Sequence, residues 1–133
     1  MAFVADNSVV LAWFVGSQST AYSEKMLRRV SREAIHVPVV WSLEFANALR
    51  QLERRRKLAP EASAELLAAV DALGLQADAS PPGQARLLDL ARLYDLSVYD
   101  ASYLELAIRL AVPLATQDSA LAAAAARAGL RAS

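Results

Sequence analysis

Residues 99–118 read YDASYLELAIRLAVPLATQD, and they show most clearly the alternation of helix and strand that the rest of the chain continues. Its first half places apolar side chains at helical spacing, and Pro113 ends that helix. The short apolar run at 114–116 is typical of a buried parallel strand. Asp100 opens the first helix, and Asp118 follows the strand and opens an alanine-rich helix. The stretch therefore predicts helix, strand and helix, with a carboxylate just beyond the carboxyl end of the strand.

The rest of the chain continues this alternation of short apolar runs and amphipathic segments. The predicted strands are 2–5, 34–37, 75–77 and 114–116, with a further edge strand at 130–131. The predicted helices before residue 99 are 9–14, 21–33, 42–57, 61–73 and 84–94. Strands that alternate with helices predict a three-layer α/β/α domain with a central, mainly parallel sheet. We expect one domain over residues 1–133, because neither a repeat nor a linker interrupts the pattern.

Two of these helices carry a predicted buried face. In helix 42–57 the apolar stripe is expected to consist of Leu43, Ala46, Leu49 and Leu52. In helix 21–33 it is expected to consist of Tyr22, Met26, Leu27 and Val30.

Composition excludes several classes of function. The formal net charge is zero, so the chain is not a strongly basic nucleic-acid-binding domain, although a local basic stripe stays open. Cysteine is absent, which excludes disulfides, thiolate metal sites and a cysteine nucleophile. The chain lacks an apolar run long enough for a transmembrane helix, and its first residues lack the basic region of a signal peptide. We therefore expect a cytoplasmic protein without a membrane partner.

Four carboxylates fall at one edge of the predicted sheet. Asp6 comes directly after the first strand, and Asp118 comes directly after the strand at 114–116. Glu44 lies in the first turn of the helix after the second strand, and Asp100 begins the helix that leads to the last one. In open parallel sheets, ligands bind at the carboxyl ends of the strands. The four acids are therefore candidates for one partly buried site.

Each acid also has a simpler interpretation. Asp6 and Asp118 suit helix N-caps, and Asp100 and Glu44 suit the first turn of a helix, where they complement its dipole. What capping does not explain is their common location. Two carboxylates 4 Å apart repel by roughly 4 kcal/mol at an effective dielectric of about 20, so a shared pocket favours a bound cation. Oxygen ligands without His or Cys select Mg²⁺ or Mn²⁺, which serve phosphodiester chemistry.

Other α/β functions fit the sequence less well. A phospho-receiver needs an acidic pair after the first strand and a lysine after a later one, but the first strand is followed by Asp6-Asn7, and neither Lys25 nor Lys57 follows a strand. A dehalogenase-like phosphatase needs a second Asp where Ser8 stands. The sequence also lacks a glycine-rich phosphate-binding loop. A metal-dependent nuclease remains the preferred hypothesis.

In four segments, taken in order and spacing, the chain resembles the PIN-domain family. These are 6–8 (DNS), 37–38 (VP) with 43–49 (LEFANAL), 99–104 (YDASYL) and 113–118 (PLATQD). The resemblance covers nearly the whole chain and is greatest to VapC-type toxin ribonucleases of bacterial toxin–antitoxin pairs. It implies a PIN-like fold and an endoribonuclease that leaves a 5′-phosphate and a 3′-hydroxyl. A non-catalytic PIN-like interaction or RNA-binding module is the alternative.

The resemblance also assigns roles to individual residues. It implies that Asp6, Glu44, Asp100 and Asp118 bind Mg²⁺ or Mn²⁺ and orient the attacking water. Ser8 and Thr116 match polar positions that support the acids. Asn47 lies one turn beyond Glu44 and is expected to hold its orientation. Asn7 departs from the small residue that is usual there.

The same resemblance implies partners. We expect an RNA substrate, a homodimer and a cognate antitoxin, which lays a helix in a groove near the first helices. Trp13, Phe14 and the segment 22–30 are the candidate lining of that groove. Packing in the core is the alternative role for these aromatic side chains.

Overall fold

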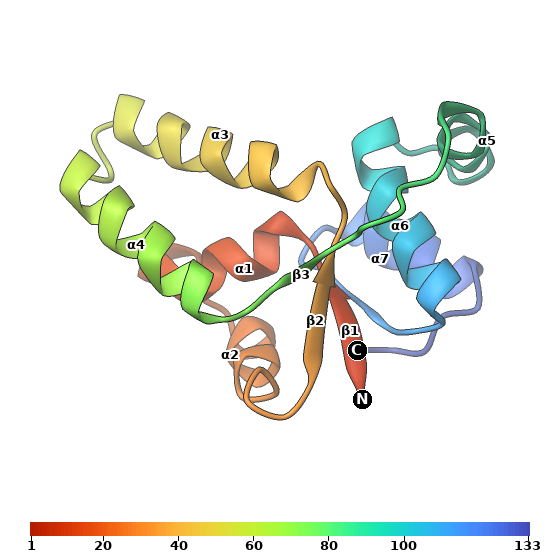
Figure 1. Cartoon of the computed structure of the whole chain (residues 1–133), viewed down its shortest axis with the longest axis horizontal. Helices are drawn as coiled ribbons and strands as arrows, with labels where there is room; N and C mark the ends of the chain where they lie inside the picture. Colours follow the sequence, from red (N-terminus) through yellow and green to blue (C-terminus); the bar gives the residue numbers. More distant parts are fainter.

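A computed structural model describes residues 1–133 as a parallel sheet between two groups of helices (Figure 1). The strands are β1 (Ala2–Ala5), β2 (Ala34–Val37), β3 (Gln76–Ala77) and β4 (Leu114–Ala115). The α-helices are α1 (Asn7–Phe14), α2 (Ala21–Leu27), α3 (Trp41–Arg54), α4 (Pro60–Ala72), α5 (Gln84–Tyr94), α6 (Val98–Leu110) and α7 (Ser119–Arg127), with a short 3₁₀ helix, η1 (Gly16–Gln18), before α2. None of these helices combines the length and apolarity needed to cross a membrane.

The sheet has the strand order β3-β2-β1-β4, and every neighbouring pair is parallel. Alternate residues of the central strand β1 point to opposite faces. Phe3 packs in a cluster with α1 to α4, whereas Val4 packs in a second cluster with α6 and α7. Figure 1 shows these two groups of helices on either side of the strands. The expected three-layer α/β/α architecture is confirmed.

The carboxyl ends of β1 and β4 lie level with each other. Val4 is in register with Leu114 and Ala5 with Ala115, and the Asp6 amide donates to the Ala115 carbonyl at 3.1 Å. This register brings the residues that follow the two strands to the same point on the edge of the sheet, although they are far apart in the sequence.

The buried face of α3 differs from the expected one. Leu49 and Leu52 are buried as predicted, but Leu43 is 72% exposed, and Ala46 also faces solvent. Phe45 is buried instead and stacks on Trp41 with 5.0 Å between ring centroids. Two aromatic rings one turn apart bury more apolar surface than Leu43 and Ala46 would, so they turn α3 toward the core.

Two other expectations on secondary structure are wrong, and a third is slightly displaced. Helix α2 ends at Leu27 rather than residue 33, because the next residues form turns with i to i−3 hydrogen bonds and Arg29 pairs with Glu33. Residues 130–131 form no strand; Leu130 instead packs on the α6–α7 cluster. Helix α6 begins at Val98 rather than Asp100, because Ser97 caps its first turn.

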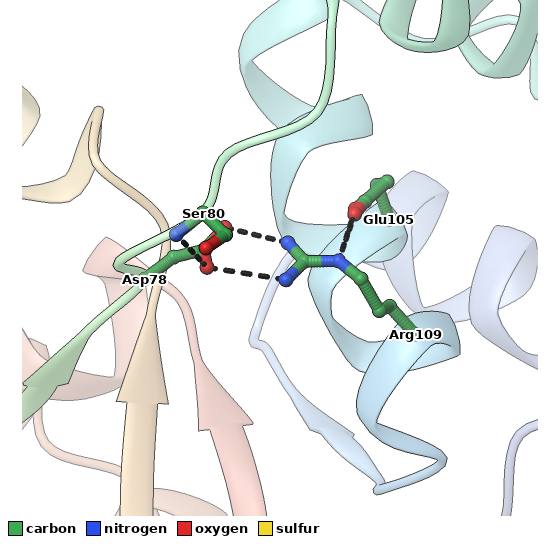
Figure 2. Close-up of polar contacts among 4 residues, drawn as sticks. All are labelled: Asp78, Ser80, Glu105 and Arg109. Atoms are coloured by element: carbon green, nitrogen blue, oxygen red, sulfur yellow. Dashed lines mark hydrogen bonds and ion pairs between the residues drawn. The ribbon is translucent and has the colours of Figure 1, made fainter.

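An ion-pair network around Arg109 fastens the loop after β3 to α6 (Figure 2). The Arg109 guanidinium donates to both carboxylate oxygens of Asp78 and to Glu105. The side chains of Asp78 and Glu105 are only 6% and 4% exposed. The hydrogen bond to Arg109 is the main reason why the pKa of Asp78 is lowered. Arg109 thus bridges two carboxylates with little exposed surface and fixes the end of the edge strand.

We predict that Arg109→Ala lowers the free energy of unfolding by about 1–3 kcal/mol, because it removes the cation that faces two carboxylates with little exposed surface, while solvent screens part of the effect at Arg109, which is 36% exposed. Arg92→Ala is the matched control, since Arg92 is 69% exposed and lies 3.7 Å from an exposed Asp89; its effect should stay within about 0.5 kcal/mol. Urea unfolding at pH 7 measures both. The contribution of Asp78 should disappear as pH falls through its lowered pKa, below 3.8. Equal effects of the two substitutions would contradict this role.

Candidate active site

Asp6 is the most enclosed carboxylate of the site. It follows β1 and caps α1, where its Oδ1 accepts from the Val9 amide at 3.2 Å and from the Ser8 hydroxyl at 2.6 Å. Its Oδ2 accepts from the Thr116 hydroxyl. The side chain is buried, and this burial raises the pKa of Asp6, while the hydrogen bonds lower it in part. Asp6 is therefore held by three donors in a fixed orientation.

The loop after β4 is bonded to the same carboxylate. Ser8 and Thr116, which were expected to support the acids, both donate to Asp6 and also accept hydrogen bonds from this loop. The Gln117 amide donates to the Ser8 hydroxyl at 3.0 Å, and the Asp118 amide donates to the Thr116 hydroxyl at 3.0 Å. The ends of β1 and β4 are thus connected through two hydroxyl groups.

Asp118 and Asp100 lie nearer to solvent. Asp118 caps α7 by accepting from the Leu121 amide at 3.1 Å, and it is exposed rather than partly buried as expected. Asp100 lies in the first turn of α6 and is half-buried. Burial is the largest cause of the raised pKa of Asp100, and the negative charges of Asp118, Glu44 and Asp6 raise it further. Asp100 thus experiences the charges of all three other acids.

Glu44 is oriented by a residue that the sequence did not indicate as part of the site. Its Oε1 accepts from the hydroxyl of Tyr103 at 2.6 Å, and Tyr103 is fully buried on α6. Asn47 was expected to hold Glu44, but it lies exposed and makes no such bond. In the sequence, Tyr103 is one of the apolar residues that recur at helical spacing before Pro113, and this spacing alone indicates packing in the core. A signal existed, because a buried tyrosine hydroxyl requires a hydrogen-bond partner.

The four acids lie at one edge of the sheet, but they do not form a preformed metal-coordination site. No group of three or more His, Cys, Asp or Glu side chains is arranged so that it could hold a metal ion. Asp6, Glu44 and Asp118 are instead held by separate hydrogen bonds, and the charges of these three acids act on Asp100. The donor set still fits Mg²⁺ or Mn²⁺, because Mg²⁺ commonly takes only one or two carboxylates and retains its waters. A cation at this edge would relieve the repulsion that acts on Asp100.

A hollow of about 340 Å³ opens beside Glu44. Its lining comes from the start of α3 and the start of α6 and consists of Val40, Leu43, Glu44, Asn47 and Tyr99. Figure 1 shows the amino-terminal ends of these two helices above the carboxyl edge of the sheet. Of the four acids, Glu44 therefore borders a depression that has apolar as well as polar walls.

Comparison with known proteins agrees with this geometry. The family model of the PIN domain matches residues 3–127, which is most of the chain. The chain belongs to the PIN-domain family. Ribonuclease VapC1 of Mycobacterium tuberculosis, in strains CDC 1551 / Oshkosh and ATCC 25618 / H37Rv, is 36% identical to it over 125 residues. That match covers 91% of this PIN domain and 89% of the relative.

A solved structure supports the fold independently. The crystal structure of PAE2754 from Pyrobaculum aerophilum superposes with a TM-score of 0.73 and covers 93% of this PIN domain and 84% of that chain. At 22% identity, this likeness concerns the fold alone. The resemblance to VapC-type PIN domains, expected from four short segments, is confirmed by matches that extend over nearly the whole chain.

We predict that Asp100→Asn stabilises the metal-free protein at pH 7 by roughly 0.5–2 kcal/mol, a gain typical of relieving a strained functional site. The substitution removes a carboxylate that is disfavoured by burial and by three neighbouring charges. The gain should shrink as pH falls through the raised pKa of Asp100, above 3.8, because the wild-type side chain then becomes neutral too. Thermal unfolding in EDTA at several pH values measures this, with Asp89→Asn, 73% exposed, as control. No gain at pH 7 would show that the charges do not interact.

Proposed function

We propose that this PIN domain is a Mg²⁺- or Mn²⁺-dependent endoribonuclease and the toxin of a cytoplasmic toxin–antitoxin pair. The observation that carries the proposal is the edge at which Asp6, Glu44, Asp100 and Asp118 interact, in a chain 36% identical to a protein named a ribonuclease. The proposal takes residues 1–133 as one catalytic domain. Its alternative, a non-catalytic PIN-like module that binds RNA or protein, requires the same fold but no activity.

In this proposal the residues of the site have different roles. Asp6, Glu44, Asp100 and Asp118 would hold the cation, which when bound lowers the pKa of water and screens charge on a phosphate. Ser8 and Thr116 hold Asp6, and Tyr103 holds Glu44, so these two carboxylates present defined oxygens. Burial and the charges of the neighbouring acids raise the pKa of Asp100, so Asp100 retains a proton more readily than a free aspartate does. Hydrolysis of the RNA phosphodiester would leave a 5′-phosphate and a 3′-hydroxyl.

We predict that the purified chain cleaves a pool of structured RNAs in Mg²⁺ and not in EDTA. Asp6→Asn should reduce the cleavage rate roughly a hundredfold or more, since metal stabilisation of a transition state is worth several kcal/mol. Asp89→Asn, which changes an exposed carboxylate on α5, should cleave as the wild type does. Electrophoresis of end-labelled RNA measures all four conditions.

Cleavage that is as fast in EDTA, or with Asp6→Asn, as with the wild type in Mg²⁺ would come from a contaminating nuclease and would not support the proposal. Absence of cleavage together with absence of Mg²⁺- or Mn²⁺-dependent thermal stabilisation would favour the non-catalytic module.

The antitoxin would occupy a groove between α1 and the α3–α4 hairpin. A hollow of about 300 Å³ is lined there by Phe14, Leu58, Ala62, Glu65 and Leu66. It is mainly apolar and fits the apolar face of a helix. Of the aromatic side chains expected at this groove, Phe14 lines it, whereas the Trp13 ring N–H donates to the Ser23 carbonyl at 2.8 Å. The homodimer stays a prediction from the family resemblance.

We predict that Ala62→Arg prevents co-purification with the antitoxin, because a long charged side chain would fill this groove. Ala64→Arg is the matched control, since Ala64 lies on the same helix, is exposed, and does not line the groove. RNA cleavage by both free variants should match the wild type. Retained co-purification of Ala62→Arg would place the antitoxin elsewhere.

A further inference from the structure

The hollow beside Glu44 contains an aromatic ring that the fold does not use. Tyr99 is the second residue of α6, is 61% exposed, and packs against none of the three buried apolar clusters. Leu43, across the same hollow on α3, is 72% exposed. Their apolar surface therefore adds nothing to the core and lies open beside the acidic edge.

The hollow also contains a polar side chain that is free to bond to a ligand. Asn47 lies exposed on α3 one turn after Leu43, and it lines the hollow without holding Glu44. Its side-chain amide carries both donors and an acceptor, which can pair with the edge of a nucleobase. An aromatic face beside a free amide is the combination with which proteins bind unpaired RNA bases.

Two arginine side chains extend the hollow's surface along α3. Arg50 and Arg54 follow Asn47 by three and seven residues, so at 100° per residue they share its face. Both are exposed, and Arg50 makes only a loose contact of 3.6 Å with Glu53. Along the axis, Arg54 lies roughly 10 Å beyond Asn47. Positive charge on this line attracts a phosphate backbone that extends away from the four acids.

We propose that the hollow is a base-binding subsite, in which Tyr99 stacks on an unpaired RNA base next to the cleaved phosphodiester and Asn47 bonds to its edge. This inference rests on the proposed function and names how its substrate is selected. The occupant is RNA rather than a second copy of the chain, because a protein surface seated here would cover Glu44, which lines the same hollow. The subsite requires a single-stranded target, since a paired base cannot present its face to Tyr99.

A measurement of RNA binding tests the base-binding subsite without relying on cleavage. The probe is a fluorescein-labelled RNA 12-mer of randomised sequence, measured by anisotropy in the Asp6→Asn background so that the RNA stays intact. Tyr99→Ala should weaken binding roughly 5- to 150-fold, the range that corresponds to loss of one stacked base. Tyr99→Phe should bind as the parent does. Leu93→Ala is the matched control, because Leu93 is an equally exposed apolar side chain, at 70%, on α5.

A second probe separates stacking from other effects. A 12-mer that lacks bases throughout keeps its phosphates, so Tyr99→Ala and its parent should bind it equally. Weaker binding of this abasic probe by Tyr99→Ala, or equal binding of the first probe, would overturn the subsite. A shift of Tyr99→Ala from dimer to monomer in sedimentation, with binding of RNA unchanged, would overturn it in favour of a contact between copies.

Cleavage of the unlabelled pool in Mg²⁺ then distinguishes the two proposals. If the otherwise wild-type Tyr99→Ala enzyme cuts with a raised KM and loses base preference beside the cut, both proposals hold. If wild type cuts and Tyr99→Ala cuts with the same KM and preference, the subsite fails while the nuclease stands. If wild type binds the 12-mer through Tyr99 but does not cut, the nuclease fails while the subsite stands.

Discussion

The parallel pairing of β1 with β4 brings together residues that lie 110 positions apart, such as Asp6 and Thr116. Parallel strands end at the same edge of a sheet, so the residues after both strands meet there. Two hydroxyls, those of Ser8 and Thr116, complete the connection by bonding Asp6 to the loop that carries Asp118. Any shift in this register would separate the carboxylates.

The site combines this rigid frame with electrostatic repulsion. Asp6 is buried and accepts hydrogen bonds at both carboxylate oxygens, Glu44 is held by Tyr103, and the charged form of Asp100 is disfavoured by burial and by the charges around it. Carboxylates that repel one another cost stability, and a divalent cation is the ligand that offsets this cost best. The strained edge and the stable network around Arg109 lie at different ends of α6, since Asp100 is in its first turn and Arg109 in its last. One helix thus connects an end where carboxylates repel one another to an end where an arginine pairs with two carboxylates.

The helices α3 and α6 also determine what can reach the acids. Because Phe45 and Trp41 turn α3 toward the core, Leu43 and Asn47 face outward beside Tyr99. The unexpected orientation of α3 therefore creates the hollow. The packing of Trp41 and Phe45 in the core thus determines which side chains line the hollow that a single RNA strand would approach.

Local signals in the sequence were enough to predict the order of strands and helices, the three-layer architecture and four acidic candidates, because hydrophobic periodicity and capping residues act locally. They also pointed to Ser8 and Thr116, which lie within two residues of an acid. Packing between elements was needed to show that Tyr103 rather than Asn47 holds Glu44, that Phe45 displaces Leu43 from the core, and that Asp118 remains exposed. The exact rotation of a helix depends on which side chains of its neighbours fill the shared space, and periodicity in one segment does not contain that information.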